Sequence, residues 1–183
     1  MAKTNNKRNC FVSYHHDNDQ EYLDEFRKLR AGTKFSDYSL KDDIGHLTDD
    51  TIYQKVREKM RLCSVTILLI GSRTGHREWI DWELWSSLRP YNHPYDRNKS
   101  FKPNGVLGIY LPVSWSHSVP DRFEDNVQSG YAVEMDWEDV FNAAKLERKI
   151  NKAYNNRTKQ HLIVNSRERQ GGNYSNFFGL RVK

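Results

Sequence analysis

The segment Ser64–Ile70 reads SVTILLI, a continuous apolar run that ends at a glycine. Such a run is typical of a strand that is buried on both faces of a parallel sheet. Working outward, Asn9–His15 (NCFVSYH) and Gly105–Leu111 (GVLGIYL) have the same character. Shorter runs at Phe35–Leu40 and Tyr131–Met135 predict two further strands. The sequence therefore predicts five strands in one sheet.

Apolar residues at helical spacing lie between most of these strands. We expect helices over about Asp17–Arg30 and Asp50–Leu62, a third that begins at about Gly75 or Glu78 and ends at Leu88, and a fourth over Asp136–Asn155. This alternation predicts an α/β fold, a flavodoxin-like parallel sheet of order 2-1-3-4-5 with helices on both faces. Ligands bind such sheets at the carboxyl ends of the strands, here just after the first and third strands.

Three stretches carry no strong periodic signal. Tyr91–Pro103 is expected to be a polar loop with two prolines, and Val113–Gln128 is expected to be irregular. In the last part of the chain His161–Asn165 has a β-like composition.

The 183 residues are enough for one domain with its own core, and 13% aromatic residues argue against disorder. No apolar run approaches the ~18 residues of a membrane span. Met1–Asn9 contains no apolar stretch typical of a secretory signal. Cys10 and Cys63 are expected to be reduced, buried thiols. These features predict a cytoplasmic protein that does not associate with membranes.

The net charge of +5 is unevenly distributed. Lys145–Lys183 holds ten basic residues and only two acids, Glu147 and Glu168. A basic tail can bind nucleic acid, but a solvated helix face with a terminal extension is the commoner arrangement. Nucleic-acid binding is therefore the least favoured of the functions considered.

Several catalytic and binding motifs are absent from the sequence. It contains no GxGxxG, GxxxxGK[ST] or GxSxG, and none of its seven histidines has metal-ligand spacing. A resident dinucleotide, a P-loop, a nucleophile elbow and a metal site are therefore not expected.

The segment that follows the third strand carries the best candidate for chemistry. Trp79 and Glu83 are four residues apart and share one face of the expected helix. A carboxylate beside an indole at the sheet edge suits cleavage of a glycosidic bond, because a carboxylate stabilises an oxocarbenium-like transition state. The alternative is that Glu83 is a surface acid and the nearby tryptophans belong to the core.

Three segments together resemble a known family. Cys10–Asn18 (CFVSYHHDN), Ser36–Leu40 (SDYSL) and Ser64–Trp85 are similar, in order, to motifs of the bacterial TIR-like proteins of the ThsB type, from the Thoeris anti-phage system. The similarity extends over about Lys7–Pro112. The resemblance implies a TIR-like domain over residues 1–157, with 158–183 as a basic extension packed on it.

The family resemblance implies an NAD⁺-processing enzyme that breaks the nicotinamide–ribose bond and needs no resident cofactor, since NAD⁺ is the substrate. The ADP-ribose product, cyclised or joined to another molecule, would activate a separate effector. It also implies a phage-derived trigger and self-association. Carried over by motif, Glu83 is the catalytic acid, and the substrate-binding residues are Ser13, Tyr14, His15, Asp37, Ser39 and Trp79.

A second hypothesis is a non-catalytic module, TIR-like or receiver-like, that binds other proteins. Asp17 and Asp19 follow the first strand, as acids do in a receiver. However, the third strand ends in Ile70 and Gly71, with no aspartate to accept a phosphoryl group. This absence argues against phosphotransfer.

Overall fold

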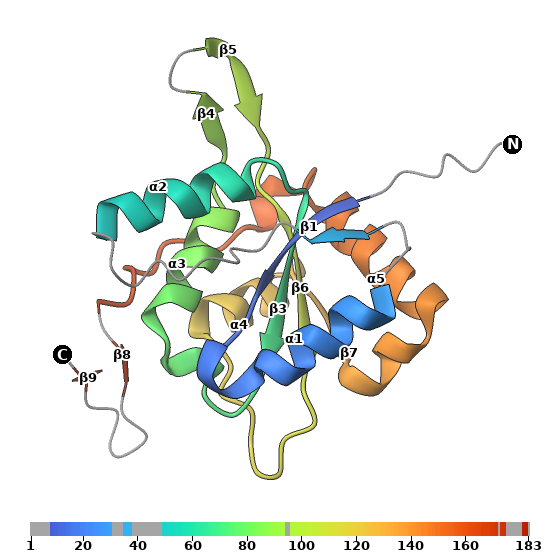
Figure 1. Ribbon diagram of the computed structural model, residues 1–183. Helices are drawn as coiled ribbons and strands as arrows, with labels where there is room; N and C mark the ends of the chain where they lie inside the picture. Colours follow the sequence, from blue (N-terminus) through green and yellow to red (C-terminus); the bar gives the residue numbers. More distant parts are fainter. Residues whose placement is uncertain are drawn as a thin grey trace, which may run out of the picture.

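Five parallel strands form the central sheet (Figure 1). The computed structural model describes residues 8–30, 35–37, 49–93, 96–171, 173–174 and 181–182. The strands are, in spatial order, β2 (Phe35–Asp37), β1 (Arg8–Ser13), β3 (Val65–Ile70), β6 (Gly105–Tyr110) and β7 (Val133–Asp136). Numbered by their place in this sheet, they follow the 2-1-3-4-5 order, so the predicted flavodoxin-like topology is confirmed.

Helices cover both faces of the sheet (Figure 1). One face carries α1 (His16–Arg30) and α5 (Ala143–Asn156), and the other carries α2 (Asp49–Met60), α3 (Glu78–Ser87) and α4 (Asp121–Gln128). The first three helices lie close to their predicted bounds. Within the described ranges no helix is long and apolar enough to cross a membrane.

The core is divided by the sheet because side chains alternate along each strand. Val12, Ile67 and Leu107 pack with α1 and α5. Leu68 and Ile70 pack with α3 and α4, and Phe11 packs with α2. All six residues of β3 are buried, as the unbroken apolar run predicts. The alternation also turns Ser13 toward the face that carries α2 and α3.

Helix α4 lies where the sequence predicts irregular chain, so that prediction is wrong. The face that α4 buries consists of Arg122, Phe123 and Asn126, and two of these three are polar. A helix whose buried face is mostly polar has no apolar period to detect. Its partner is the segment near Val164, whose backbone N–H donates to Asn126 Oδ1 and whose carbonyl accepts from Asn126 Nδ2.

Two other segments differ from prediction. The stretch expected as a polar loop forms an antiparallel hairpin, β4 (Tyr91–His93) and β5 (Asp96–Phe101), that projects beyond the amino-terminal edge of the sheet (Figure 1). The last predicted helix is divided: a 3-10 helix, η2 (Trp137–Phe141), precedes α5, and Asn142 caps α5 by accepting from the Lys145 N–H at 3.0 Å.

The end of the chain shows short elements only. Gln160–Leu162 is a 3-10 helix, η3, rather than part of a strand. The short strands β8 (Asn173–Tyr174) and β9 (Arg181–Val182) pair antiparallel. The predicted strand Phe35–Leu40 is confirmed as far as Asp37, and its last three residues lie outside the described residues.

Gly105, at the start of β6, allows α5 to lie directly on the sheet. A Cβ at Gly105 would come within 1.9 Å of the Ala153 carbonyl oxygen of α5, a contact with rigid backbone. We expect Gly105→Ala to lower the free energy of unfolding by about 2–3 kcal/mol or more. Gly130→Ala is the control, since Gly130 has open space but a φ of +82°, and should cost about 1 kcal/mol. Equal losses in urea unfolding would contradict this account.

Candidate functional site

Glu83 of α3 and Ser13 at the end of β1 form the centre of the candidate site. Burial raises the pKa of the Glu83 carboxyl to about 8, and the Ser13 hydroxyl opposes this by lowering it. Ser13 is buried, and its Oγ has no hydrogen-bond partner of standard geometry in the described part of the chain. The contact between hydroxyl and carboxyl is therefore looser than a standard hydrogen bond.

The local sequence explains why Glu83 faces inward. Ile80 and Leu84 are the buried residues that anchor α3 on the sheet. Glu83 is adjacent to Leu84 and four residues after Trp79, so it lies on the side of α3 toward β1. Trp79 packs against the cluster that includes Phe11 of β1. The pattern of α3 thus brings an indole and a carboxyl group to the same side of the helix, as predicted.

Asp19, in the first turns of α1, lies at the carboxyl end of β3. A Cβ on Gly71 would lie 2.7 and 2.8 Å from the two Asp19 carboxylate oxygens, so a larger residue there would have to displace the Asp19 side chain. Burial raises the pKa of Asp19 to about 6, while hydrogen bonds from the His15 backbone and the Thr74 hydroxyl lower it. Its Oδ2 is buried without a hydrogen-bond partner among the described residues.

His15 lies between Ser13 and Asp19 in the chain, and it is 4% exposed. Its pKa is lowered by burial first and then by the positive charge of Arg77, with a smaller contribution from Arg73, whereas Asp17 raises it. The imidazole is therefore neutral at physiological pH. Its Nδ1 is buried and has no partner in the described ranges.

A loop from the next strand lies against this edge and fixes its shape. The Ser118 N–H donates to the Gly71 carbonyl at 2.9 Å, and the Gly75 N–H donates to the Ser118 carbonyl at 2.7 Å. Thr74 Oγ1 accepts from the Gly71 N–H at 2.8 Å. The backbone after β3 is thus held on both sides.

Two of the other predicted site residues, Tyr14 and Asp37, lie away from Glu83. Tyr14 packs on the opposite face with α1, and its hydroxyl donates to Gln20 Oε1 at 2.7 Å. Asp37, the last residue of β2, is paired with Cys10 of β1. Cys10 precedes Ser13 by three residues, which corresponds to about 10 Å along the strand. Ser39 lies outside the described residues.

The sequence singled out Ser13, His15, Trp79 and Glu83, but it placed Asp19 only in the receiver hypothesis. The signal for Asp19 was an acid six residues beyond the end of β1, in the first turn of the helix that follows it. The three buried polar atoms without partners, on Ser13, His15 and Asp19, lie at the same sheet edge. Such atoms are costly unless something else satisfies them, so this edge suits a polar ligand.

The charge state of the site suits a cationic ligand. With no ligand bound, the Glu83 carboxyl is largely protonated at neutral pH. A positive charge placed beside it would favour the ionised form. His15 is neutral and does not repel a cation. In the part of the chain described, no group of three or more His, Cys, Asp or Glu side chains is arranged to hold a metal ion.

A feature that the sequence did not predict holds α3 from its outer side. Arg122 of α4 is 1% exposed and binds both carboxylate oxygens of Asp81, at 2.7 and 3.1 Å. The same guanidinium donates to the carbonyls of Arg167 and Glu168. We call Val164–Gln170 the C-terminal strap, since it crosses α3 at this point.

The strap also contacts the residues on either side of Glu83. Gln170 donates its backbone N–H to Asp81 Oδ2 at 2.9 Å and accepts from Trp82 Nε1 at 3.0 Å. The Arg169 guanidinium lies 4.7 and 4.9 Å from the rings of Trp82 and Trp85. These contacts fix the rotation of α3, on which the direction of Glu83 depends.

A comparison with protein families gives one match. A family model described as the TIR-like domain of the Thoeris protein ThsB matches residues 11–116. These residues are more than half of the 183 in the chain, and they include Ser13, His15, Trp79 and Glu83.

Removing the Arg122 guanidinium should be far more damaging than removing an exposed one. We expect Arg122→Met to lower the free energy of unfolding by about 3–5 kcal/mol, because Asp81 would stay buried without its partner. Arg167→Met is the control: Arg167 binds Asp125 at the surface and should cost about 1 kcal/mol or less. Urea unfolding measures both, and similar losses would refute the role given to Arg122.

Proposed function

Because the chain belongs to the TIR-like family of the Thoeris protein ThsB, which gives it a role in anti-phage defence, we propose that it cleaves the nicotinamide–ribose bond of NAD⁺ at Glu83. The observation that supports this most directly is the half-buried Glu83, whose carboxyl pKa is raised by desolvation, beside the Ser13 hydroxyl at the carboxyl edge of the sheet. A carboxyl group whose pKa is raised by its surroundings is a common feature of catalytic sites.

The proposed reaction follows from the charge on NAD⁺. When the bond from ribose C1′ to the nicotinamide nitrogen breaks, the nitrogen keeps the electron pair and nicotinamide leaves as a neutral molecule. The positive charge then moves to the ribose, as in an oxocarbenium ion. An ionised Glu83 stabilises that charge, and it does so strongly because water is largely excluded.

Other residues of the site have supporting roles in this proposal. Ser13 and His15 offer uncharged polar atoms to the carboxamide side of nicotinamide, and Trp79 provides an apolar wall. A nucleophile then attacks C1′ and yields an ADP-ribose derivative, either cyclic or joined to a second molecule. A closed, dry crevice favours an internal nucleophile over water.

The product is proposed to be a signal. Thoeris membership points to a partner effector protein, and we propose that the ADP-ribose derivative activates it. We also propose that a phage-derived trigger and self-association bring the site to full activity, and that NAD⁺ is a substrate, with no resident cofactor. Tyr14, Asp37 and Ser39 remain proposed substrate contacts in that assembled state.

Replacing the carboxylate should abolish the reaction. We expect Glu83→Gln to lower nicotinamide release from NAD⁺ by at least about 100-fold, measured by mass spectrometry in lysate from phage-infected cells. Glu138→Gln, which alters an exposed carboxylate far from the site, should leave release unchanged. Equal turnover by the wild type and Glu83→Gln would exclude the proposed role of Glu83. No turnover by any form would favour the protein-binding module.

The pH profile should report the raised pKa of Glu83. If the ionised carboxylate is the active form, kcat/KM for NAD⁺ should rise about tenfold per pH unit and level off above about 8. The profile of kcat should level off at a lower pH, because the positive charge of bound nicotinamide lowers the pKa of the carboxyl. Activity that falls as the pH rises would contradict this, since it would require the protonated form.

A further inference from the structure

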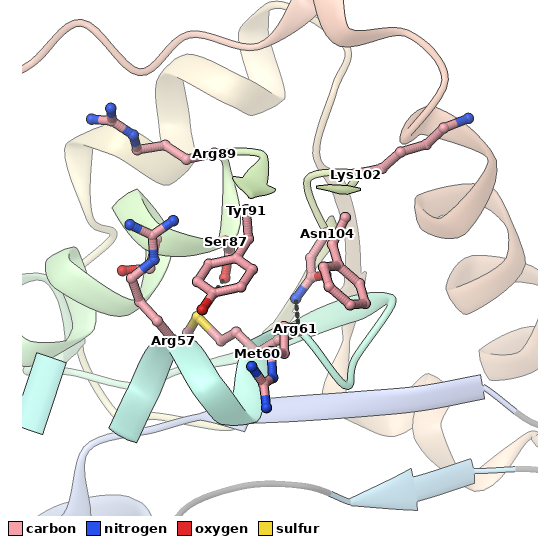
Figure 2. A pocket seen from close by; sticks show the side chains of 10 residues that line it. Arg57, Met60, Arg61, Ser87, Arg89, Tyr91, Lys102 and Asn104 are labelled. Carbon is pink, nitrogen blue, oxygen red and sulfur yellow. Dashed lines mark hydrogen bonds between the residues drawn. The ribbon is translucent and has the colours of Figure 1, made fainter. Parts of the chain in front are cut away.

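A second pocket lies at the opposite, amino-terminal edge of the sheet (Figure 2). Its walls come from the end of α2, the end of α3 and the hairpin formed by β4 and β5. Ser13, Trp79 and Glu83 are not among its lining residues. The pocket is therefore separate from the site proposed for NAD⁺, although both include residues of α3.

Basic side chains surround this pocket. Arg57, Arg61, Arg89 and Lys102 line it, and none of the lining residues is acidic. Figure 2 shows Arg57 and Arg61 near the ring of Tyr91, whereas Arg89 and Lys102 extend outward from the rim of the pocket. The Arg57 and Arg61 guanidinium carbons lie 5.1 and 6.0 Å from the centre of that ring, so the aromatic ring helps to hold both side chains in place.

The floor of the pocket is a buried polar network. Ser87 Oγ lies 2.7 Å from Thr66 Oγ1, and Asn104 Nδ2 donates to the same oxygen at 3.2 Å. Ser86, beside them, is 6% exposed, and its Oγ has no hydrogen-bond partner within the described ranges. A rigid floor thus carries one buried hydroxyl that is available to a ligand in the pocket.

The helix dipoles do not cancel the positive charge. Both α2 and α3 end at the pocket, and the C-terminus of a helix carries about half a negative charge. One or two basic residues near the C-terminus of a helix can be explained by their attraction to the helix dipole alone. Here four basic side chains line the pocket, so the effect of two helix ends alone does not account for them.

We propose that this pocket binds a small ligand that carries phosphate groups. Arginine recognises phosphate through paired N–H donors, and a hydroxyl on a fixed floor adds a further donor. The buried Ser86 hydroxyl and the surrounding basic side chains are the two independent observations that support it. Ser86 lies one helical turn from Glu83, so a bound ligand would rest against the helix that carries the catalytic carboxylate.

Calorimetric titration of the full chain tests this with two probes, pyrophosphate and ADP. We expect saturable binding of at least one: pyrophosphate if free phosphate is enough, and ADP alone if the nucleoside is also needed. Arg61→Gln/Arg89→Gln should weaken that binding at least about tenfold. The control, Arg148→Gln/Lys152→Gln, removes the same charge from exposed positions on α5 and should leave the affinity unchanged.

Ser86→Ala provides a test that does not depend on net charge. It should weaken binding several-fold while leaving the melting temperature unchanged or higher, because it removes a buried hydroxyl that has no partner. The proposal is overturned if neither probe binds saturably, or if the control pair loses as much affinity as Arg61→Gln/Arg89→Gln. Tighter binding of a short single-stranded oligonucleotide, with steep salt dependence, would also overturn it. Because binding is measured without turnover, the result is independent of NAD⁺ cleavage.

Discussion

The ion pair between Arg122 and Asp81 connects the parts of this protein that the candidate site depends on. The arginine is almost fully buried, and a buried guanidinium is tolerated only when its donors are satisfied. Its partners come from α3, through Asp81, and from the C-terminal strap, through Asn165 and two backbone carbonyls. One side chain of α4 therefore joins the strap to the helix that carries Glu83.

The two edges of the sheet have opposite electrostatic characters. At the carboxyl edge burial raises the pKa of Glu83 to about 8 and lowers that of His15, so both are largely uncharged at pH 7, whereas Asp19, with a pKa raised to about 6, stays mostly ionised. At the amino edge four basic side chains line the pocket. Helix α3 contributes Glu83 to the first of these sites and Ser86 and Ser87 to the second.

The sequence predicted those parts of the fold that depend on apolar patterning. The run at Ser64–Ile70 gave the central strand, and the spacing of Trp79 and Glu83 gave one face of α3 correctly. It did not predict α4, because Arg122 and Asn126 are buried polar residues whose partners lie more than 35 positions away. The place of Asp19 beside Gly71 also depends on how α1 packs on β3, which no local pattern records.

The position of the C-terminal strap in the chain determines when, during synthesis, the contacts around α3 can be completed. Asp81 accepts a hydrogen bond from the backbone of Gln170, which is made 89 residues later. At ribosomal rates of about 5–20 residues per second, that interval is roughly 5–20 s. Until then, Arg122 and Asp81 can pair only with each other, and the indole of Trp82 lacks its carbonyl acceptor. The contacts that the strap makes with α3 and Arg122 can therefore form only after most of the chain has been made.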